Sequence, residues 1–374
     1  MTTKPQTIKL EEVIEKNGIW FKKYSPKPFT GCVVNYHEDG QLQYKGYWWD
    51  GKEDGLEEKY HENGKLEHKK NYKDGKIDGV YESYYKNGQL GYKGNFKDGV
   101  TDGVYESYGK NGKLKSKGNF KDGERDGSSE YYYDNGQLET KFNWKDGNPD
   151  GLYEYYYDNG QLRTHGNHKD GELNGLTEDY YENGQLKYKG NYKDRKEDGL
   201  EETYHKNGKL ESKRNHKDGK RDGLVEGYDE KGQLFYKGNF KDGEPDGVYE
   251  SYYKNGKLES KGNHKDGELD GLEEIYHENG ILQYRRNYKD GIQDGLSERY
   301  SDNGQFMFKE NYKDGIQDGP FEYYYEKNGQ LSKKGNYKDG KEDGLWETYR
   351  IDGLSMGNIC YKNDRRVHTS NCEK

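Results

Sequence analysis

The sequence predicts an all-β protein: an extended single antiparallel sheet of tandem 24-residue β-hairpin repeats, elongated and twisted. Three observations predict this fold class. A glycine recurs every 24 residues along most of the chain. Each repeat holds two short aromatic, β-prone runs separated by turn sequences. Tyrosine and glycine are also unusually frequent, with 40 and 53 copies among 374 residues.

Overall composition taken alone would indicate disorder. Only 28% of the residues are hydrophobic, 36% are charged, and the mean hydropathy is −1.53. Such a chain has little apolar surface to offset its conformational entropy. Because so many tyrosines and glycines recur at fixed positions, we interpret the chain as a repeat protein instead.

The glycine that begins each repeat defines thirteen complete repeats and a weaker fourteenth. Each step is 24 residues except the last, which is 25 because of one extra residue near Lys327. The glycines are Gly31, Gly55, Gly79, Gly103, Gly127, Gly151, Gly175, Gly199, Gly223, Gly247, Gly271, Gly295, Gly319 and Gly344.

A representative repeat runs from Gly79 to Gly99, with the sequence GVYESYYKNGQLGYKGNFKDG. Its two runs, VYESYY and QLGYKGNF, flank Asn87-Gly88. Asn-Gly between two such runs predicts a hairpin with a type I′ turn, which needs positive φ at both central residues. The KDGxxDG segment is then expected to be the loop to the next hairpin.

Charged residues predict the strand register. A turn centred on Asn63-Gly64 places Glu58 opposite Lys69. Glu recurs at the position of Glu58 in every later repeat, and the position of Lys69 is Lys in most repeats. Opposite charges across a hairpin contribute about 0.2–1 kcal/mol each, so we interpret this ladder as register control rather than a recognition strip.

Tyrosine occupies one position in all fourteen repeats, from Tyr36 to Tyr349. The position after the turn is Leu in all but one repeat, and another position is always aromatic or His. Residues repeated in every unit are most simply framework that stacks one hairpin on the next.

The segment Tyr44-x-Gly46-x-Trp48-x-x-Gly51-x-x-x-Gly55 resembles the MORN repeat pattern at every fixed position. The form YYxNGQLxxKGNYKDGxxDG is closer to the bacterial MORN repeat variant found in YwqK-type antitoxins. Some repeats depart from the pattern: Lys70, Phe142, Arg214, Arg286 and Glu310 stand where its first glycine is expected, and Gly109, Asp229 and Ser301 lie in a position that is mostly Tyr or His.

The repeats and the resemblance divide the chain into three parts. Residues 1–30 are expected to form an N-terminal leader or cap, which resembles the leader of the YwqK group. Residues 31–357 form the repeats, and residues 358–374 form a C-terminal tail that could cover the last sheet edge.

Composition excludes several partner classes. The net charge of −9 comes from finely alternating signs, and no basic block could neutralise a nucleic-acid backbone. Contact with anionic lipid is disfavoured for the same reason. There is no signal-like apolar segment, so a cytoplasmic location is expected. The three cysteines predict neither a disulfide framework nor a zinc knuckle, and a single Cys360–Cys372 bridge stays open.

No catalytic residue, metal site or cofactor is expected. The paired aspartates of each loop offer too few carboxylates for an EF-hand-like calcium site, and Asp and Gly are ordinary turn residues. The histidines in one aromatic column lie about 19 Å apart and cannot share one metal ion. The sequence contains no nucleophile elbow, P-loop or HExxH motif, so we expect a non-enzymatic protein.

Positions that differ between repeats are the better candidates for binding. Five tyrosines in the fifth and sixth repeats are expected on one face of the sheet, because side chains alternate along a strand. They are Tyr131, Tyr133, Tyr153, Tyr155 and Tyr157. They form either an exposed partner-binding patch or the buried side of a curved sheet.

The resemblance implies a function that the residues alone do not. Similarity to the YwqK group implies an antitoxin or immunity-type protein that neutralises a toxin by direct binding. Similarity to eukaryotic MORN proteins implies a scaffold or a membrane-peripheral tether. A third alternative is a surface ligand-binding array like choline- or glucan-binding repeats, which rely on tryptophan, whereas this chain has 5.

Overall fold

The computed structural model describes residues 6–372, which consist of β-strands and two short 3-10 helices. The chain divides into two compact blocks. We call them the N-terminal block, which ends at Gly184, and the C-terminal block, which begins at Gln185. Residues 1–5 of the expected leader and 373–374 of the expected tail lie outside the described residues.

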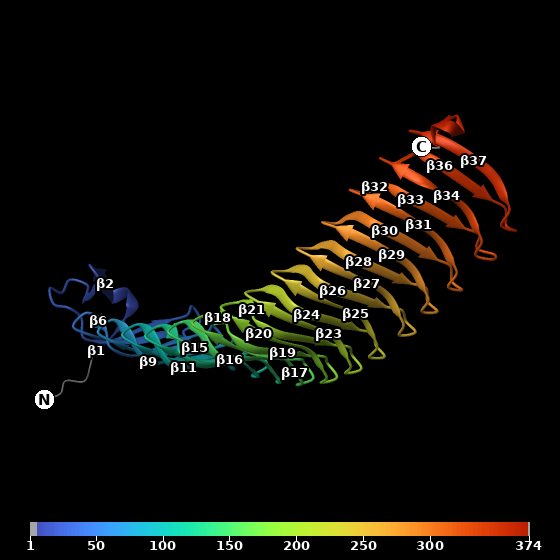
Figure 1. Ribbon diagram of the computed structural model, residues 1–374. Helices are drawn as coiled ribbons and strands as arrows, with labels where there is room; N and C mark the ends of the chain where they lie inside the picture. The colour runs from blue at the N-terminus through green and yellow to red at the C-terminus, as the bar shows by residue number, and fades with distance from the viewer. Residues whose placement is uncertain (1–5, 373–374) are drawn as a thin grey trace. The chain divides into compact units, whose positions relative to one another are not determined.

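The N-terminal block contains strands β1 to β19 and one 3-10 helix, shown from blue to green in Figure 1. Its elements are β1 (Gln6–Lys9), η1 (Leu10–Glu12), β2 (Val13–Lys16), β3 (Ile19–Lys22), β4 (Gly31–Tyr36), β5 (Leu42–Trp49), β6 (Lys52–Glu53), β7 (Gly55–Tyr60), β8 (Leu66–Lys73), β9 (Lys76–Tyr84), β10 (Leu90–Lys97), β11 (Val100–Tyr108), β12 (Leu114–Lys121), β13 (Glu124–Arg125), β14 (Gly127–Tyr132), β15 (Leu138–Lys145), β16 (Asn148–Tyr156), β17 (Leu162–Lys169), β18 (Glu172–Leu173) and β19 (Gly175–Tyr180).

The C-terminal block contains the remaining strands and the second 3-10 helix. Its elements are β20 (Leu186–Lys193), β21 (Lys196–Glu197), β22 (Gly199–Tyr204), β23 (Leu210–Lys217), β24 (Lys220–Tyr228), β25 (Leu234–Lys241), β26 (Glu244–Tyr252), β27 (Leu258–Lys265), β28 (Glu268–Tyr276), β29 (Leu282–Lys289), β30 (Ile292–Tyr300), β31 (Phe306–Lys313), β32 (Ile316–Gln317), β33 (Gly319–Tyr324), β34 (Leu331–Lys338), β35 (Lys341–Glu342), β36 (Gly344–Tyr349), β37 (Ser355–Lys362), β38 (Arg365–Val367) and η2 (Thr369–Asn371).

Within the repeats of each block, neighbouring strands of the sheet pair antiparallel. β10 pairs with β9 on one side and β11 on the other, and β26 pairs likewise with β25 and β27. The predicted all-β fold of tandem antiparallel hairpins is confirmed in both blocks. In the described part of the chain, β1 of the leader lies parallel to β4, with Gln6 opposite Gly31. The leader therefore covers the first strand of the repeats.

The type I′ turn predicted at Asn-Gly is wrong. Gly64 has φ +74°, but Asn63 is not among the residues with positive φ. The Gly64 amide donates to the His61 carbonyl at 2.9 Å, and the His61 amide donates to the Lys65 carbonyl at 2.8 Å. This is a three-residue loop, in which a type I turn is followed by a glycine in the left-handed conformation.

The tight turn lies instead in the KDG segment that was expected to be a loop. Asp74 and Gly75 have φ +49° and +81°, and Lys73 pairs with Lys76 across them. Positive φ at both central residues is the type I′ geometry. The chain thus runs directly from one hairpin into the next, and each block is a continuous meander.

The predicted register is confirmed through the middle of the hairpin, where Glu58 lies opposite Lys69. It shifts by one residue near the turn, because Lys59 faces His68 while Tyr60 faces Leu66. The residue between His68 and Leu66 forms a bulge. The same shift recurs in the other hairpins, for example between Ser251 and Tyr252.

We call the face that carries the Glu, Lys and Tyr columns the ladder face. Glu250 shows its pattern: Tyr252 donates to its carboxylate at 2.5 Å. Lys237 of the preceding hairpin lies 2.9 Å from the same carboxylate, and Lys261 of its own hairpin lies 3.3 Å away. Glu250 therefore joins two hairpins, rather than only the two strands of one.

The opposite face carries the residues that directly precede and follow each glutamate of the Glu column in the sequence. We call it the variable face. Its central column changes from repeat to repeat and contains deeply buried residues, including Ser129, Tyr153, Val225 and Trp346. At the start of the repeats, Val33 and Trp48 join a core cluster with Ile8, Val13 and Phe29 of the leader. The interior of each block is therefore formed on the variable face.

At the end of the chain, β38 pairs with β37, with Cys360 opposite Val367. The boundary expected between residues 357 and 358 lies within β37. The bridge left open from the sequence is present: Cys360 and Cys372 form a disulfide with their Cα atoms 5.9 Å apart. No helix in residues 6–372 is long and apolar enough to cross a membrane.

Candidate functional site

The variable face follows one rule that links two facing positions. Where the first glycine of the MORN pattern is present, the residue opposite it in the same hairpin is often a large aromatic residue. A Cβ at Gly118 would overlap the ring of Tyr105, and one at Gly166 would overlap the ring of Tyr153. Each ring lies opposite its glycine within one hairpin. Glycine at this position therefore provides the space that the aromatic ring fills.

Repeats that lack this glycine pair the substituting residue with a small or acidic one. In the sheet, Phe142 lies opposite Ser129, and Glu310 lies opposite Ser297. The three basic residues all face glutamates; these pairs are Lys70 with Glu57, Arg214 with Glu201, and Arg286 with Glu273. The departures from the repeat pattern thus create local sites of different chemistry.

The predicted tyrosine patch is centred on one such departure, Phe142. Tyr153 is buried, and its ring centroid lies 6.1 Å from Phe142, 5.8 Å from Tyr155 and 4.7 Å from His168. Burial lowers the pKa of His168. Tyr153 is therefore part of the packed interior of this face.

Tyr131 and Tyr155 lie at the rim of the same cluster and are half-buried. The Arg125 guanidinium lies 5.9 Å from the Tyr131 ring and 4.9 Å from the Trp144 ring. Arg163 lies 5.1 Å from the Tyr155 ring. Stacked arginine and tyrosine at a rim are the residue types enriched in protein interfaces.

Tyr133 and Tyr157 have a structural role. Their hydroxyls donate to the backbone carbonyls of Tyr156 and Tyr180 in the following repeats, at 2.7 and 2.8 Å. His37, His61, Tyr85, His205, Tyr253, His277 and Tyr325 make the equivalent contact in their own repeats. Of the five predicted residues, Tyr153 and Tyr155 pack against Phe142, and Tyr131 lies on the same face beside Arg125. The other two link successive repeats near the turns.

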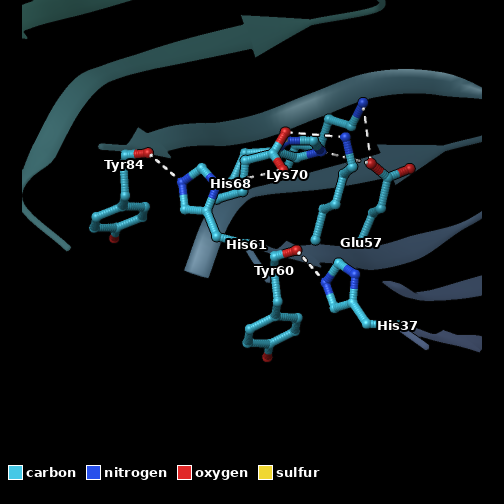
Figure 2. A network of polar contacts seen from close by, with 9 residues as sticks. His37, Glu57, Tyr60, His61, His68, Lys70 and Tyr84 are labelled. Atoms are coloured by element: carbon cyan, nitrogen blue, oxygen red, sulfur yellow. Dashed lines mark hydrogen bonds and ion pairs between the residues drawn. The ribbon is translucent and has the colours of Figure 1, made fainter. Parts of the chain in front are cut away.

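A polar pocket of about 350 Å³ lies near the start of the repeats and is lined by His37, Lys59, His61 and Glu67 among others. Figure 2 shows that His37 and His61 point to the backbone oxygens of Tyr60 and Tyr84, both at 3.1 Å. Lys59 donates to Glu67 at 3.0 Å. The pocket offers charges of both signs.

Behind this pocket, Glu57 accepts contacts from His68 and Lys70, both at 3.1 Å (Figure 2). Burial alone would raise the pKa of Glu57, but the His68 hydrogen bond and the Lys70 charge lower it overall. Glu57 is therefore a buried anion that is paired with its two neighbours.

Sequence reasoning missed a cluster in the C-terminal block. Glu197, Glu201 and His216 each bring one ligand-type atom within 4.8 Å of the other two. The histidines of one column are too far apart to share a metal ion, but a single histidine can still meet glutamates from other columns. A signal was present, because this is the only repeat in which the three corresponding columns hold Glu, Glu and His together.

Comparison with known proteins identifies the repeats. The model of the MORN repeat variant matches thirteen segments that cover more than half of the chain. The chain belongs to the MORN repeat variant family. The matched MORN segments are residues 29–50, 53–74, 77–98, 101–122, 125–146, 149–170, 173–194, 197–218, 221–242, 245–266, 269–290, 293–314 and 317–339. MORN repeats are generally protein-interaction modules.

No curated protein matches this MORN chain at a significant level. Among solved structures, a crystal structure of TcdB2-TccC3 is 13% identical, with a TM-score of 0.17, over 89% of this chain and 19% of that one. The Photorhabdus luminescens Tc holotoxin pore is 13% identical, with a TM-score of 0.18, over 89% and 18%. The match thus spans about a fifth of those longer chains, and such TM-scores support no inference about this protein.

Proposed function

We propose that this protein is a non-enzymatic protein-binding repeat protein whose partner contacts the variable face. The observation that carries the proposal is the difference between the two faces. The ladder face repeats the same Glu, Lys and Tyr contacts, whereas the variable face changes from repeat to repeat. A partner that must be recognised specifically needs residues that differ along its binding surface, and a uniform ladder does not offer them.

The contact residues we favour are Tyr131 and Tyr155, with Arg125 and Arg163 beside them. Their rings are half-buried and held by packing against Phe142 or arginine. Aromatic side chains that are already ordered lose little entropy on binding, and tyrosine adds a polar hydroxyl.

We further propose that the partner is a toxin and that the protein acts as an antitoxin or immunity-type protein in the cytoplasm. The resemblance of the repeats to the YwqK group supports this. The mechanism is occlusion, in which the variable face covers the toxin's active surface. A scaffold that holds a non-toxic protein is the competing outcome.

Residues found at the same position in other repeats provide variants that the fold should tolerate. Tyr131→Ser and Tyr155→Ser replace each tyrosine with the residue that other repeats carry in that column, as at Ser107. The matched control is Leu152→Ser, because Leu152 is exposed on the ladder face of β16 and Ser128 holds the same column.

The experiment co-expresses the protein with the product of the neighbouring gene. We expect co-purification and restored growth, both reduced at least tenfold by the double tyrosine variant and unchanged by Leu152→Ser. At least 1.4 kcal/mol of interface energy would then lie in the two rings. Binding without a growth effect would support a scaffold and reject the antitoxin. Equal loss in the control would reject the variable face as the binding surface.

A further inference from the structure

Three side chains of the C-terminal block converge on one point of the variable face. Glu197 comes from β21, Glu201 from β22 and His216 from β23. His216 Nε2 lies 3.3 Å from Glu197 Oε2, and His216 Nδ1 lies 3.4 Å from Glu201 Oε2. The side chains of Glu201 and His216 are only 8% and 6% exposed. The imidazole thus lies between two carboxylates in a mostly buried site.

Each carboxylate is oriented through its other oxygen. Tyr188 Oη donates to Glu197 Oε1 at 3.4 Å, and Arg214 Nη1 donates to Glu201 Oε1 at 2.8 Å. These contacts turn both Oε2 atoms toward His216. Hydrogen bonds from surrounding residues orient metal-ligating carboxylates in the same way.

The ring itself lacks a satisfactory partner. His216 Nδ1 is buried and has no hydrogen-bond partner, although Glu201 Oε2 is nearby. A neutral imidazole has one N–H and one lone pair, so one of its nitrogens must face a carboxylate oxygen without a proton between them. A positive charge placed among the three side chains removes this conflict.

We propose that Glu197, Glu201 and His216 bind a divalent transition-metal cation of the Zn²⁺ class. Zn²⁺ takes imidazole nitrogen and carboxylate oxygen at about 2.0–2.2 Å, which sets neighbouring ligand atoms about 3.3 Å apart in a tetrahedron. The 3.3 Å contact between His216 Nε2 and Glu197 Oε2 agrees with this spacing. One ligand atom from each of the three side chains lies within 4.8 Å of the other two. Glu197 is 33% exposed, so solvent reaches the site and can supply the fourth ligand.

An equivalent repeat 144 residues earlier supplies an internal control. There Glu53 and Glu57 correspond to the two carboxylates, and Tyr72 corresponds to His216. Lys70 and His68 contact Glu57 in that repeat, both at 3.1 Å. Both repeats carry the two carboxylates, but the earlier repeat has Tyr72 in place of His216.

The test uses the full chain without a histidine tag, after chelator treatment and removal of the chelator. Zn²⁺ is titrated by calorimetry, and Co²⁺ serves as a spectroscopic probe of coordination. His216→Tyr introduces the residue that the preceding repeat carries at Tyr192, so the fold should tolerate it. Glu197→Gln keeps the shape of the side chain while removing its charge, and Glu53→Gln is the matched control.

We expect one Zn²⁺ per chain with micromolar or tighter affinity, and a tetrahedral Co²⁺ absorption band. His216→Tyr and Glu197→Gln should each weaken binding more than about tenfold, and Glu53→Gln should not. The melting temperature should rise with Zn²⁺ only where the site is intact. Absence of saturable binding, or unchanged binding in both site variants, would overturn the proposal.

Discussion

Two hairpins of the C-terminal block carry a histidine in the same column but in opposite surroundings. In β22–β23, Arg214 lies opposite Glu201, and His216 lies between Glu201 and Glu197. The face of this hairpin is ionic, and the histidine contacts charged oxygens.

In β26–β27 the corresponding face is aromatic. Gly262 lies opposite Tyr249, which stacks against Tyr236 with ring centroids 6.1 Å apart. His264 meets the Tyr249 ring edge-on at 6.0 Å, and burial lowers the pKa of His264. Burial at this position therefore favours the neutral form of the histidine.

The comparison shows that the residue facing the variable column decides the chemistry of its repeat. Glycine leaves room for an aromatic ring, while arginine requires a carboxylate opposite. Since the backbone register is the same in both hairpins, a pair of substitutions converts one environment into the other. The following predictions test this rule.

The largest effect is expected from Arg214→Gly. It leaves the buried Glu201 carboxylate without its ionic partner, which should cost about 3–5 kcal/mol of unfolding free energy. Denaturant unfolding measures this loss. Adding Glu201→Tyr should recover most of it, because the pair then matches Gly262 and Tyr249. A single variant as stable as the parent protein would contradict the ionic interpretation.

The next largest loss of stability is expected from Gly238→Ala, which tests whether this glycine makes room for an aromatic ring. The added methyl group overlaps the Tyr249 ring and should cost about 1–3 kcal/mol. Thermal unfolding is the measurement, and Gly109→Ala is the control. Near Gly109 the new atom meets the ends of the Asn111 and Lys115 side chains, which can move away. Equal costs at both positions would mean that ring space is not the reason for the glycine.

A smaller, opposite effect is expected from Arg195→Gly. Arg195 has φ +66° in the tight turn where most repeats carry glycine. A non-glycine residue in this conformation costs about 1–2 kcal/mol, so the variant should be more stable by about 1 kcal/mol. An increase in melting temperature supports this. A decrease would show that the contacts of the Arg195 side chain outweigh its backbone strain.

The smallest expected effect on stability comes from Glu250 on the ladder face and appears only at acid pH. The Tyr252 hydrogen bond, followed by Lys237 and Lys261, lowers the pKa of Glu250 to about 2. A lowered folded-state pKa contributes stability above the ordinary pKa of glutamate, and this contribution is lost as the pH falls toward 2.

Tyr252→Phe should therefore move the Glu250 titration upward, toward the ordinary value of glutamate. NMR titration of the carboxyl group measures this shift. Tyr253→Phe is the control, because Tyr253 donates to the Tyr276 carbonyl instead. An unchanged titration in Tyr252→Phe would mean that the lysines alone set the pKa of Glu250.

Much of the fold was predictable because it depends on local spacing. Glu58 opposite Lys69 follows from the period of two along a strand and the place of the turn. The turn type was not predictable, because Asn-Gly suits both a two-residue turn and a three-residue loop. The bulge between Leu66 and His68 selects the second.

The sites were less predictable than the fold. Alternation correctly puts Tyr131, Tyr153 and Tyr155 on one face, but the burial of Tyr153 depends on Phe142 and His168 from other strands. The proposed metal ligands were missed for a similar reason. Glu197, Glu201 and His216 become neighbours only when the short strand β21 packs beside the hairpin formed by β22 and β23.

Residue spacing by itself determined the repeat, the strand alternation and the pairing of charged columns, since these depend on backbone geometry that every repeat shares. The tertiary structure alone decided which side chains are buried, which turn each Gly occupies and where Glu197, Glu201 and His216 meet. These outcomes depend on side-chain volume and on contacts between strands, and a few substitutions are enough to change both.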